Sequence, residues 1–516
     1  MSGQLVKSSL TVGGLTLVSR VFGFIRDMLV AYFLGATAQT DAFFVAIRIP
    51  NLLRRLFAEG AFNAAFLPMF AGMLKTEGEE VSLKFASQVG SYLLMVLLVV
   101  TALCMIFTPE LMDILAPGFS QDPIKYTLTI TLTRITFPYI IFISLVCLLG
   151  GILNSTGKFA VVAMVPIIMN ITMIVGLFIF RPLVPSDAHA LSAGVTLAGV
   201  TQFLWLVWFC RKAKMLPRFG FAKLTPQVKK LLLLIAPAAL GASVGQVNVL
   251  MDTFFASNLG NAISYLYYAD RIYEMPIGVI GVAVGTALLP TLSKHARAGD
   301  KDAVIADTNQ ALMLLTLFGL PAAVALATIA TPIIQIVFER GAFLAADTKM
   351  VVPALIIYCF GLPAYLALKV FTSSFYAEQN TKTPMKVAVF CMGINFLINF
   401  IFIEHFGYLT LAASSVFSAW LNVTITGALL YKQGNFRPDR KLMIFILKSG
   451  FSCTIMALVL YYCALPLRDY FMGSSWQKAL SGCLLISVGG GVYFACLFAS
   501  RAAKPEQIFK ILKKKS

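Results

Sequence analysis

Long apolar stretches set the strongest limit on what this chain can fold into. About twenty consecutive apolar residues are enough for a helix to cross the hydrocarbon core of a bilayer. Such stretches, separated by short turns or charged breaks, follow one another along all 516 residues. Only 12% of the residues are charged, whereas about a quarter are charged in an average soluble domain. The sequence therefore predicts an all-α polytopic membrane protein.

Counting these stretches predicts fourteen transmembrane helices. Their predicted limits are residues 9–34, 40–73, 83–107, 124–152, 158–180, 189–211, 229–257, 262–293, 306–331, 350–377, 384–403, 408–431, 441–465 and 476–500.

Lysine and arginine are concentrated in alternate loops, which predicts the orientation. If the N-terminus is cytoplasmic, the basic cluster at 211–230 and the C-terminal ILKKKS tail both fall on the cytoplasmic side. An excess of basic residues in cytoplasmic loops is the usual signature of topology. We therefore expect both termini in the cytoplasm, and we attribute the net charge of +18 to topology and anionic membrane lipids rather than to nucleic acid.

The sequence repeats itself with an offset of about 222 residues. FLP ending at Pro68 matches LLP ending at Pro290, and Thr108-Pro109 matches Thr331-Pro332. Six predicted spans fall within one offset, so the two copies share one orientation and are parallel repeats. We predict two six-helix lobes around a central cationic cleft, with alternating access by rocking of the lobes. The predicted domains are an N-terminal lobe at 1–211, a basic cytoplasmic linker at 212–228, a C-terminal lobe at 229–432, and two further helices with a basic tail at 433–516.

Eight charged side chains lie within the first two predicted spans. They are Arg20, Arg26, Asp27, Asp41, Arg48, Arg54, Arg55 and Glu59. An ionised side chain at membrane depth costs at least about 2.5–3.5 kcal/mol, so it normally faces a wet cavity or a partner. Five arginines against three carboxylates leave a positive surplus that an anionic ligand could neutralise. The alternative for Arg48, Arg54 and Arg55 is that each one snorkels to the water interface.

The second copy of the repeat adds one arginine to this set. Arg271 lies in YYADRIYE, near the position that corresponds to Arg48. A cleft lined by Arg20, Arg26 and Arg54 on one wall and by Arg271 on the other would be strongly cationic. Because guanidinium groups hold phosphates through paired, charge-assisted hydrogen bonds, we expect a diphosphate ligand rather than a neutral or cationic drug.

A second polar set suggests a cation site. Asp252 lies deep in the seventh predicted span, Asn395 and Asn399 lie four residues apart in the eleventh, and Ser415 lies in the twelfth between Ser414 and Ser418. One carboxylate with amide and hydroxyl oxygens suits a monovalent cation such as sodium, and Asp252 could instead carry a proton. The alternative is a set of ordinary interhelical hydrogen bonds, each usually worth under about 1 kcal/mol.

Catalytic motifs are missing from the sequence. It contains no P-loop, no HExxH and no GxSxG, and the three histidines are far apart. We therefore predict no enzyme activity and no cofactor other than a coupling ion. The competing function classes are an exporter of small cationic drugs, which should show surplus carboxylates, a membrane enzyme acting on polyprenyl diphosphates, and a structural protein.

Four segments carry a resemblance to a known family: SRVFGFIRD, TDAFFVAIRIPNLLRRLFAEGAFNAAFLP, YYADRIYEMPIGVIGVAVGTALLPTLSK and FYAEQNTKTP. They resemble the MurJ (MviN) branch of the multidrug/oligosaccharidyl-lipid/polysaccharide exporter superfamily, over the whole chain. The resemblance implies a flippase that moves lipid II, the undecaprenyl-diphosphate-linked peptidoglycan precursor, to the outer leaflet of the bacterial cytoplasmic (inner) membrane for cell-wall synthesis. The alternative is an exporter of another lipid-linked oligosaccharide or of small drugs with the same fold. The resemblance leaves open which protein partners of cell-wall synthesis the chain has.

The same resemblance implies roles for individual residues. The positions that match polar positions implicated in family function are Arg20, Arg26, Asp27, Asp41, Asn51, Arg54, Glu59 and Arg271. The last two predicted spans resemble a helix pair that lines a groove for the lipid tail. Some family members use a sodium site whose positions match Asp252, Asn395 and Asn399. Because both span-eleven positions are Asn here, the site would hold a single carboxylate, and we expect weaker ion binding.

Overall fold

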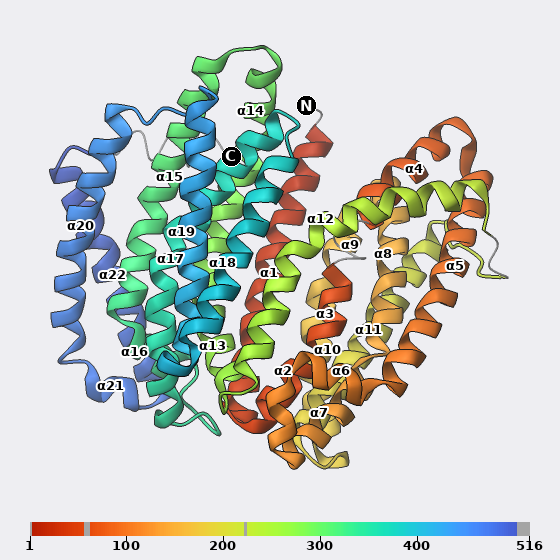
Figure 1. The fold of residues 1–516 in the computed structure, drawn as a ribbon, viewed down its shortest axis with the longest axis horizontal. Helices are drawn as coiled ribbons and strands as arrows, with labels where there is room; N and C mark the ends of the chain where they lie inside the picture. The colour runs from red at the N-terminus through yellow and green to blue at the C-terminus, as the bar shows by residue number, and fades with distance from the viewer. Residues whose placement is uncertain (1–2, 56–61, 221–223, 503–516) are drawn as a thin grey trace. The chain divides into compact units, whose positions relative to one another are not determined.

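The structure is a computed structural model that describes residues 3–55, 62–220 and 224–502, and every regular element in those ranges is a helix (Figure 1). It divides into two compact units, Met1–Ile263 and Ser264–Ser516, called unit 1 and unit 2 below. Glu59, one of the predicted site residues, and the basic C-terminal tail lie outside the described residues. The predicted all-α fold is confirmed for the part of the chain that the structure describes.

Unit 1 begins with a long helix and ends with another. Its helices are α1 (Gly3–Leu34), α2 (Ala38–Ala46), α3 (Arg48–Leu53), α4 (Phe62–Thr76), α5 (Gly78–Ile106), α6 (Thr108–Leu115), η2 (Pro117–Gln121), α7 (Pro123–Thr136), α8 (Tyr139–Ser155), α9 (Phe159–Ala163), α10 (Val165–Phe180), η3 (Arg181–Leu183), α11 (Asp187–Lys212) and α12 (Pro226–Ala256).

Unit 2 contains most of α13 and all the helices that follow it in the described residues. These are α13 (Ala262–Pro276), η4 (Ile277–Gly281), α14 (Val282–Arg297), α15 (Lys301–Thr328), α16 (Ala330–Val337), α17 (Ala345–Ala377), α18 (Lys382–Phe406), α19 (Leu409–Lys432), α20 (Arg440–Ala464), α21 (Arg468–Met472) and α22 (Ser475–Ala499).

Helix boundaries recur along the chain at the spacing of the sequence repeat. α1 ends at Leu34 and α12 ends at Ala256, which is 222 residues later. α6 and α16 are eight residues long, and they begin at Thr108 and Ala330, again 222 residues apart. Both short helices carry a proline in their first turn, where a missing N–H costs nothing. The arrangement of two lobes around a cleft stays a prediction.

Several of the predicted spans are not continuous helices. The span predicted at 124–152 consists of α7 and α8, and the span predicted at 158–180 consists of α9 and α10. The span predicted at 40–73 consists of α2, α3 and α4, with a break at Ile47 and Pro50 inside α3. The span predicted at 262–293 consists of α13, a five-residue π-helical segment after Pro276, and α14. The spans at 40–73 and 262–293 occupy corresponding positions of the repeat. Proline removes a backbone donor and crowds the preceding turn, and π-helical segments are often found at functional sites.

Ten stretches of the described helices are long and apolar enough to cross a membrane. The predicted spans outside this set are 9–34, 40–73, 229–257 and 262–293, which are the first two spans of each repeat copy. α1 carries Arg20, Arg26 and Asp27, and the spans at 40–73 and 262–293 are broken. The total of fourteen transmembrane helices therefore stays a prediction.

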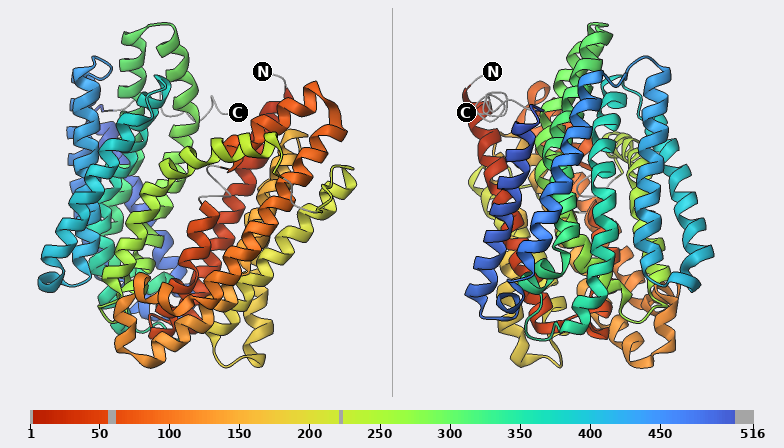
Figure 2. Two further views of the ribbon diagram at one scale, coloured as in Figure 1. Left: turned by 45° about the vertical axis from the view of Figure 1, so that its right-hand side comes forward. Right: turned by 90° about the vertical axis from the view of Figure 1, so that its left-hand side faces the viewer.

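The helices of unit 1 pack closely around α10 and α11. A Cβ atom built on Gly176 of α10 would lie 3.1 Å from Cα of Gly194 on α11, so the two backbones are nearly in contact. α1 packs against α10, and α12 curves along its length as it passes α4, α5 and α6 (Figures 1 and 2). The packing of α1 on α10 brings together the residues of the site described below.

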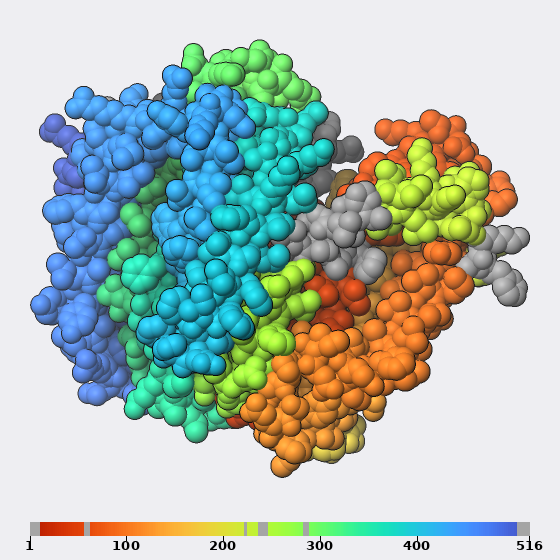
Figure 3. All heavy atoms as spheres, in the orientation of Figure 1, coloured from red at the N-terminus to blue at the C-terminus, as the bar shows by residue number. Residues whose placement is uncertain are grey.

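α18 and α19 form part of the face of unit 2 that Figure 3 shows. Large apolar side chains on these two helices are exposed: Phe390, Phe400, Phe406, Phe417 and Trp420. Exposed apolar surface of this extent is expected of helices that face lipid rather than water.

Candidate functional site

Arg26 is held at the interface between α1 and α10. Its Nε and Nη2 atoms donate to Oδ1 of Asp27, at 3.1 and 2.7 Å, and its Nη1 atom donates to Oδ1 of Asn170, at 3.0 Å. The side chain of Arg26 is 15% exposed and that of Asp27 is 6% exposed. Two predicted residues, Arg26 and Asp27, are therefore in contact, and Asn170, which sequence reasoning missed, completes the contact from another helix.

Arg20, Asn51 and Arg54 are further predicted residues of the first two spans. Arg20 is exposed on α1, about a turn and a half before Arg26. Arg54 follows α3, and its Nε atom donates to Oδ1 of Asn51 at 3.4 Å, so these two predicted residues support each other locally.

Arg271 lies on α13 in unit 2, just before the π-helical segment. Its Nη2 atom donates to the hydroxyl of Tyr267 at 2.9 Å, and its guanidinium carbon lies 4.6 Å from the centre of the Tyr267 ring. Nη1 approaches Oε2 of Glu274 at 3.3 Å, with the two side chains 32% and 47% exposed. The Tyr267 ring and the partly exposed ion pair with Glu274 therefore both position the Arg271 guanidinium.

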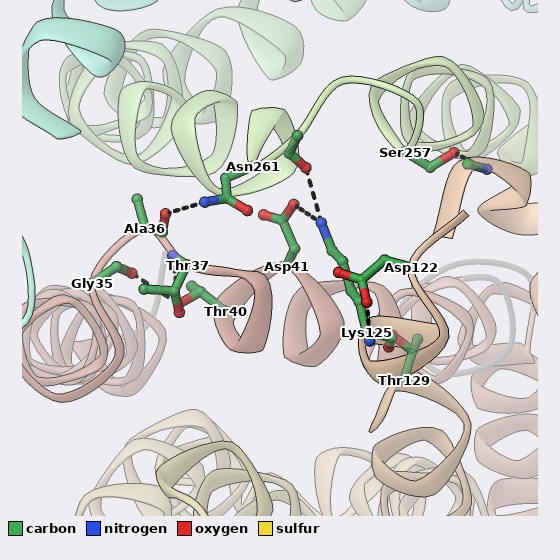
Figure 4. A network of polar contacts seen from close by, with 12 residues as sticks. Gly35, Ala36, Thr37, Thr40, Asp41, Asp122, Lys125, Thr129, Ser257 and Asn261 are labelled. Carbon is green, nitrogen blue, oxygen red and sulfur yellow. Dashed lines mark hydrogen bonds and ion pairs between the residues drawn. The ribbon is translucent and has the colours of Figure 1, made fainter. Parts of the chain in front are cut away.

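Asp41 takes part in a buried ion pair at one end of unit 1 (Figure 4). Its Oδ2 atom accepts a hydrogen bond from Nζ of Lys125 at 2.8 Å, and the two side chains are 0% and 6% exposed. Nζ also donates to the carbonyl of Gly260 at 2.9 Å, and it lies 4.2 Å from the centre of the Phe119 ring. The pair therefore joins α2, α7 and the turn between α12 and α13.

Hydrogen bonds between side chains and the backbone join the segments near this ion pair. The Gly118 amide donates to the Ser257 hydroxyl at 3.1 Å, and Asn261 Nδ2 donates to the Ala36 carbonyl at 2.9 Å (Figure 4). A Cβ atom on Gly118 would lie 2.4 Å from the Ser257 carbonyl oxygen, so this position admits only glycine without movement of the backbone. Asp122 accepts from the amides of Ile124 and Lys125 and caps α7, which fixes the start of the helix that presents Lys125.

The residues predicted to bind a cation are distributed over both units. Asp252, on α12 in unit 1, accepts from Nδ2 of Asn248 at 3.2 Å. In unit 2 the buried Asn395 donates to the Ser414 hydroxyl at 3.1 Å, and Asn399 donates to Oδ1 of Asn395 at 3.2 Å. The Ser414 hydroxyl donates in turn to Oδ1 of Asn399, which closes a ring of three hydrogen bonds.

The ring of hydrogen bonds includes two residues of the predicted cation site, Asn395 and Asn399. The oxygens of Asn395 and Asn399 suit a sodium ion chemically, but each already accepts a hydrogen bond within the ring. The hydroxyl in the ring belongs to Ser414, and the backbone carbonyl of the predicted Ser415 accepts from the Tyr365 hydroxyl. The cation site itself stays a prediction. Among the described residues, no three His, Cys, Asp or Glu side chains group closely enough to hold a metal ion.

The motif FYAEQNTKTP forms the turn between α17 and α18. Gln379 has a φ of +61°, and Oδ1 of Asn380 accepts from the Thr383 amide at 3.1 Å near the start of α18. Glu378 accepts from Nδ2 of Asn435 in the turn after α19. Burial raises the pKa of Glu378 above its usual value, and the charge of Lys301 opposes that shift. The motif therefore stabilises the turn between α17 and α18 in unit 2.

Known proteins resemble the chain over nearly its whole length. The family model described as lipid II flippase MurJ matches residues 30–479. The chain belongs to the MurJ family. Its relatives in this family include a probable lipid II flippase MurJ of Rhizobium meliloti (strain 1021), 37% identical over 99% of this chain and 97% of that protein. The lipid II flippase MurJ of Burkholderia cenocepacia is 35% identical, with 90% of each chain covered.

Solved structures agree with this membership. A structure described as lipid II flippase MurJ in an inward closed conformation has a TM-score of 0.79 and 27% identity, covering 95% of this chain and 99% of that one. An inward-facing MATE-family transporter of the MOP superfamily has a TM-score of 0.65 at 15% identity, covering 82% and 98%, and it shares the fold alone. Together with the ten apolar stretches, membership of the MurJ family makes this chain a multi-pass membrane transporter.

Sequence reasoning missed Lys125 and Asn170. Lys125 lies 84 residues from Asp41, and it follows Asp122 and Pro123 like an ordinary residue of a first helical turn. A signal was available in Asp41, because a carboxylate in an apolar stretch needs a cationic partner. For Asn170 the only signal is a single amide in an otherwise apolar run, which usually indicates no more than an interhelical contact.

The buried ion pair yields a prediction about stability in the MurJ family fold. Lys125→Met leaves Asp41 as an uncompensated buried charge, so we expect a loss on the order of 3–5 kcal/mol. In thermal unfolding of purified protein, Lys125→Met should melt well below the parent, and Asp41→Asn combined with Lys125→Met should recover much of the loss. Arg181→Gln, in a pair with Asp187 whose arginine is 51% exposed, is the matched control and should change stability by roughly 0–1 kcal/mol. An unchanged melting temperature for Lys125→Met would contradict a stabilising role for the pair.

Proposed function

We propose that this chain is a flippase that carries lipid II from the inner to the outer leaflet of the bacterial cytoplasmic membrane by alternating access. The observation that carries the proposal is the match of curated lipid II flippases over 90–99% of the chain. Lipid II presents a diphosphate, so its carrier must hold a doubly charged group inside a membrane protein.

The described arginines suit that task. Arg26 has its guanidinium fixed on α1 by Asp27 and Asn170, and Arg271 is positioned on α13 by Tyr267. Guanidinium groups fixed in this way bind phosphate oxygens through paired, charge-assisted hydrogen bonds. We infer that Arg26 and Arg271, with Arg20 and Arg54, line opposite walls of a cleft between two lobes, and that α20 and α22, which pack together, provide the surface for the lipid tail.

Arginine substitutions test the substrate site. Arg26→Ala or Arg271→Ala should reduce lipid II flipping about tenfold or more, because each removes charge-assisted bonds to the diphosphate. Lys at either position should restore activity only in part, since a point charge lacks the guanidinium fork. The measurement is the exposure of lipid II to an impermeant probe in cells depleted of the parent protein, with Arg181→Ala as the control that should complement fully. Normal lipid II exposure with both alanine variants would contradict the proposal.

We further propose that both termini are cytoplasmic, on the evidence of the basic loops. Ser120 in η2 and Glu77 between α4 and α5 are exposed and lie in loops predicted on opposite sides of the membrane. In a variant without the nine native cysteines, Ser120→Cys should react with an impermeant maleimide added to intact cells, and Glu77→Cys should react only after permeabilisation. Labelling of Glu77→Cys from outside would reverse the topology.

Coupling to a sodium or proton gradient through Asp252 is also a proposal. Asp252→Asn keeps the shape of the side chain and removes its charge, so we expect slower flipping and no response to an imposed sodium gradient. Asn399→Ala should act in the same direction but more weakly, because it removes a neutral group. Proteoliposomes with sodium and pH gradients imposed separately distinguish the two ions. If Asp252→Asn flips lipid II at the parental rate under both gradients, the driving force does not act through Asp252.

A further inference from the structure

Asn170 makes two hydrogen bonds from α10 to different parts of α1. Its Oδ1 atom accepts from Nη1 of Arg26 at 3.0 Å, and its Nδ2 atom donates to the backbone carbonyl of Ser19 at 3.1 Å. The residue is only 6% exposed. It spans nearly two turns of α1, from the arginine back to the carbonyl seven residues earlier.

The chemistry of the two partners permits one orientation of the amide. A guanidinium can only donate and a backbone carbonyl can only accept, so the amide oxygen must face Arg26 and the amide nitrogen must face Ser19. Gly23 lies between the two partners on α1, and a Cβ atom built there would be 3.4 Å from Nδ2 of Asn170. A Cβ atom at this distance would be in ordinary van der Waals contact, so the amide packs closely on the α1 backbone at Gly23 and alanine would still fit there.

The contact orients Arg26 without neutralising it. Asp27 binds the edge of the guanidinium formed by Nε and Nη2, and its negative charge offsets part of the positive charge. Asn170 binds Nη1 through a neutral oxygen, so it restricts the rotation of the group and leaves the remaining charge unchanged. A carboxylate in place of the Asn170 amide would add a negative charge beside Arg26 and would weaken its attraction to an anion.

The geometry points to Asn170 as a positioning residue that holds the Arg26 guanidinium ready for the diphosphate of the lipid-linked substrate. This inference rests on the proposed function, because it takes Arg26 as a group that touches the substrate. Much of the affinity of a preorganised fork comes from orientation that is already fixed before binding. Loss of Asn170 should therefore weaken substrate binding although Asn170 need not touch the substrate.

A purely structural role is the competing interpretation, and the same helix offers a control for it. Thr172, two residues along α10, shares a 3.0 Å hydrogen bond with Thr201 of α11. Thr172→Val removes an interhelical hydrogen bond of the same helix without touching Arg26. A residue that only holds helices together should behave like Thr172 in every measurement.

The experiment measures the Kd of the purified full chain for lipid II in detergent, the melting temperature, and flipping in proteoliposomes. Asn170→Leu should weaken lipid II binding about tenfold, because binding must then order the Arg26 side chain that Asn170 no longer holds, while melting no lower than Thr172→Val. Asn170→Gln retains the amide on a longer arm and should recover part of the affinity. In an Arg26→Ala background, Asn170→Leu should change the Kd by less than about twofold, as expected for two residues that act as one unit.

Each other result overturns the inference in a recognisable way. Parental affinity for Asn170→Leu, with weakened binding by Arg26→Ala, would make Asn170 a structural residue and leave the proposed function intact. A further large loss on adding Asn170→Leu to Arg26→Ala would show that Asn170 acts independently of Arg26. Parental affinity for Arg26→Ala would remove the basis of both the inference and the proposed arginine site.

Discussion

The cost of an ionised side chain inside a membrane protein governs both polar centres of unit 1. Each cation there is held by a partner on another helix: Lys125 of α7 by Asp41 of α2, and Arg26 of α1 by Asn170 of α10. The Lys125–Asp41 pair and the Arg26 contact differ in the charge of the partner from the other helix. Lys125 and Asp41 neutralise each other in a fully buried pair, which suits a permanent clamp. The partners of Arg26 include a neutral amide beside the Asp27 carboxylate, and its side chain is 15% exposed, which suits a group that we propose also binds an anion.

Irregular backbone accompanies the charged groups. The corresponding spans at 40–73 and 262–293 are both among the spans that are broken into shorter helices, and they contain Arg54 and Arg271. Non-helical backbone at membrane depth is tolerated only where protein or a water-filled cavity satisfies its polar groups. Discontinuous helices are also where membrane transporters commonly bind their substrates. The helix breaks and the arginines therefore both indicate that these two spans bind the substrate.

Much of the architecture could be predicted from the sequence, because apolar length and turn signals act locally. The helical class, the 222-residue spacing and the shared face of Asn395 and Asn399 all follow from such local patterns, and the structure agrees. Tertiary partners could not be predicted. Nothing local links Asp41 to Lys125, and nothing local shows that α19 turns Ser414, the neighbour of the predicted Ser415, toward the asparagines. Helix breaks were also missed, since an apolar run that contains proline can be kinked or continuous.

The repeat explains why a positioning amide was available next to Arg26. α9 and α18 begin 223 residues apart, and α10 and α18 end 226 residues apart. Asn170 and Asn395 are separated by 225 residues, three more than the repeat offset, so they lie within one helical turn of corresponding positions of the two copies. Both are buried, and both bond to a neighbouring helix: Asn395 to Ser414, and Asn170 to Arg26 and the Ser19 carbonyl. The shared scaffold provides an interhelical amide in each copy, and in unit 1 the presence of arginine on the facing helix gives that amide a cation to orient.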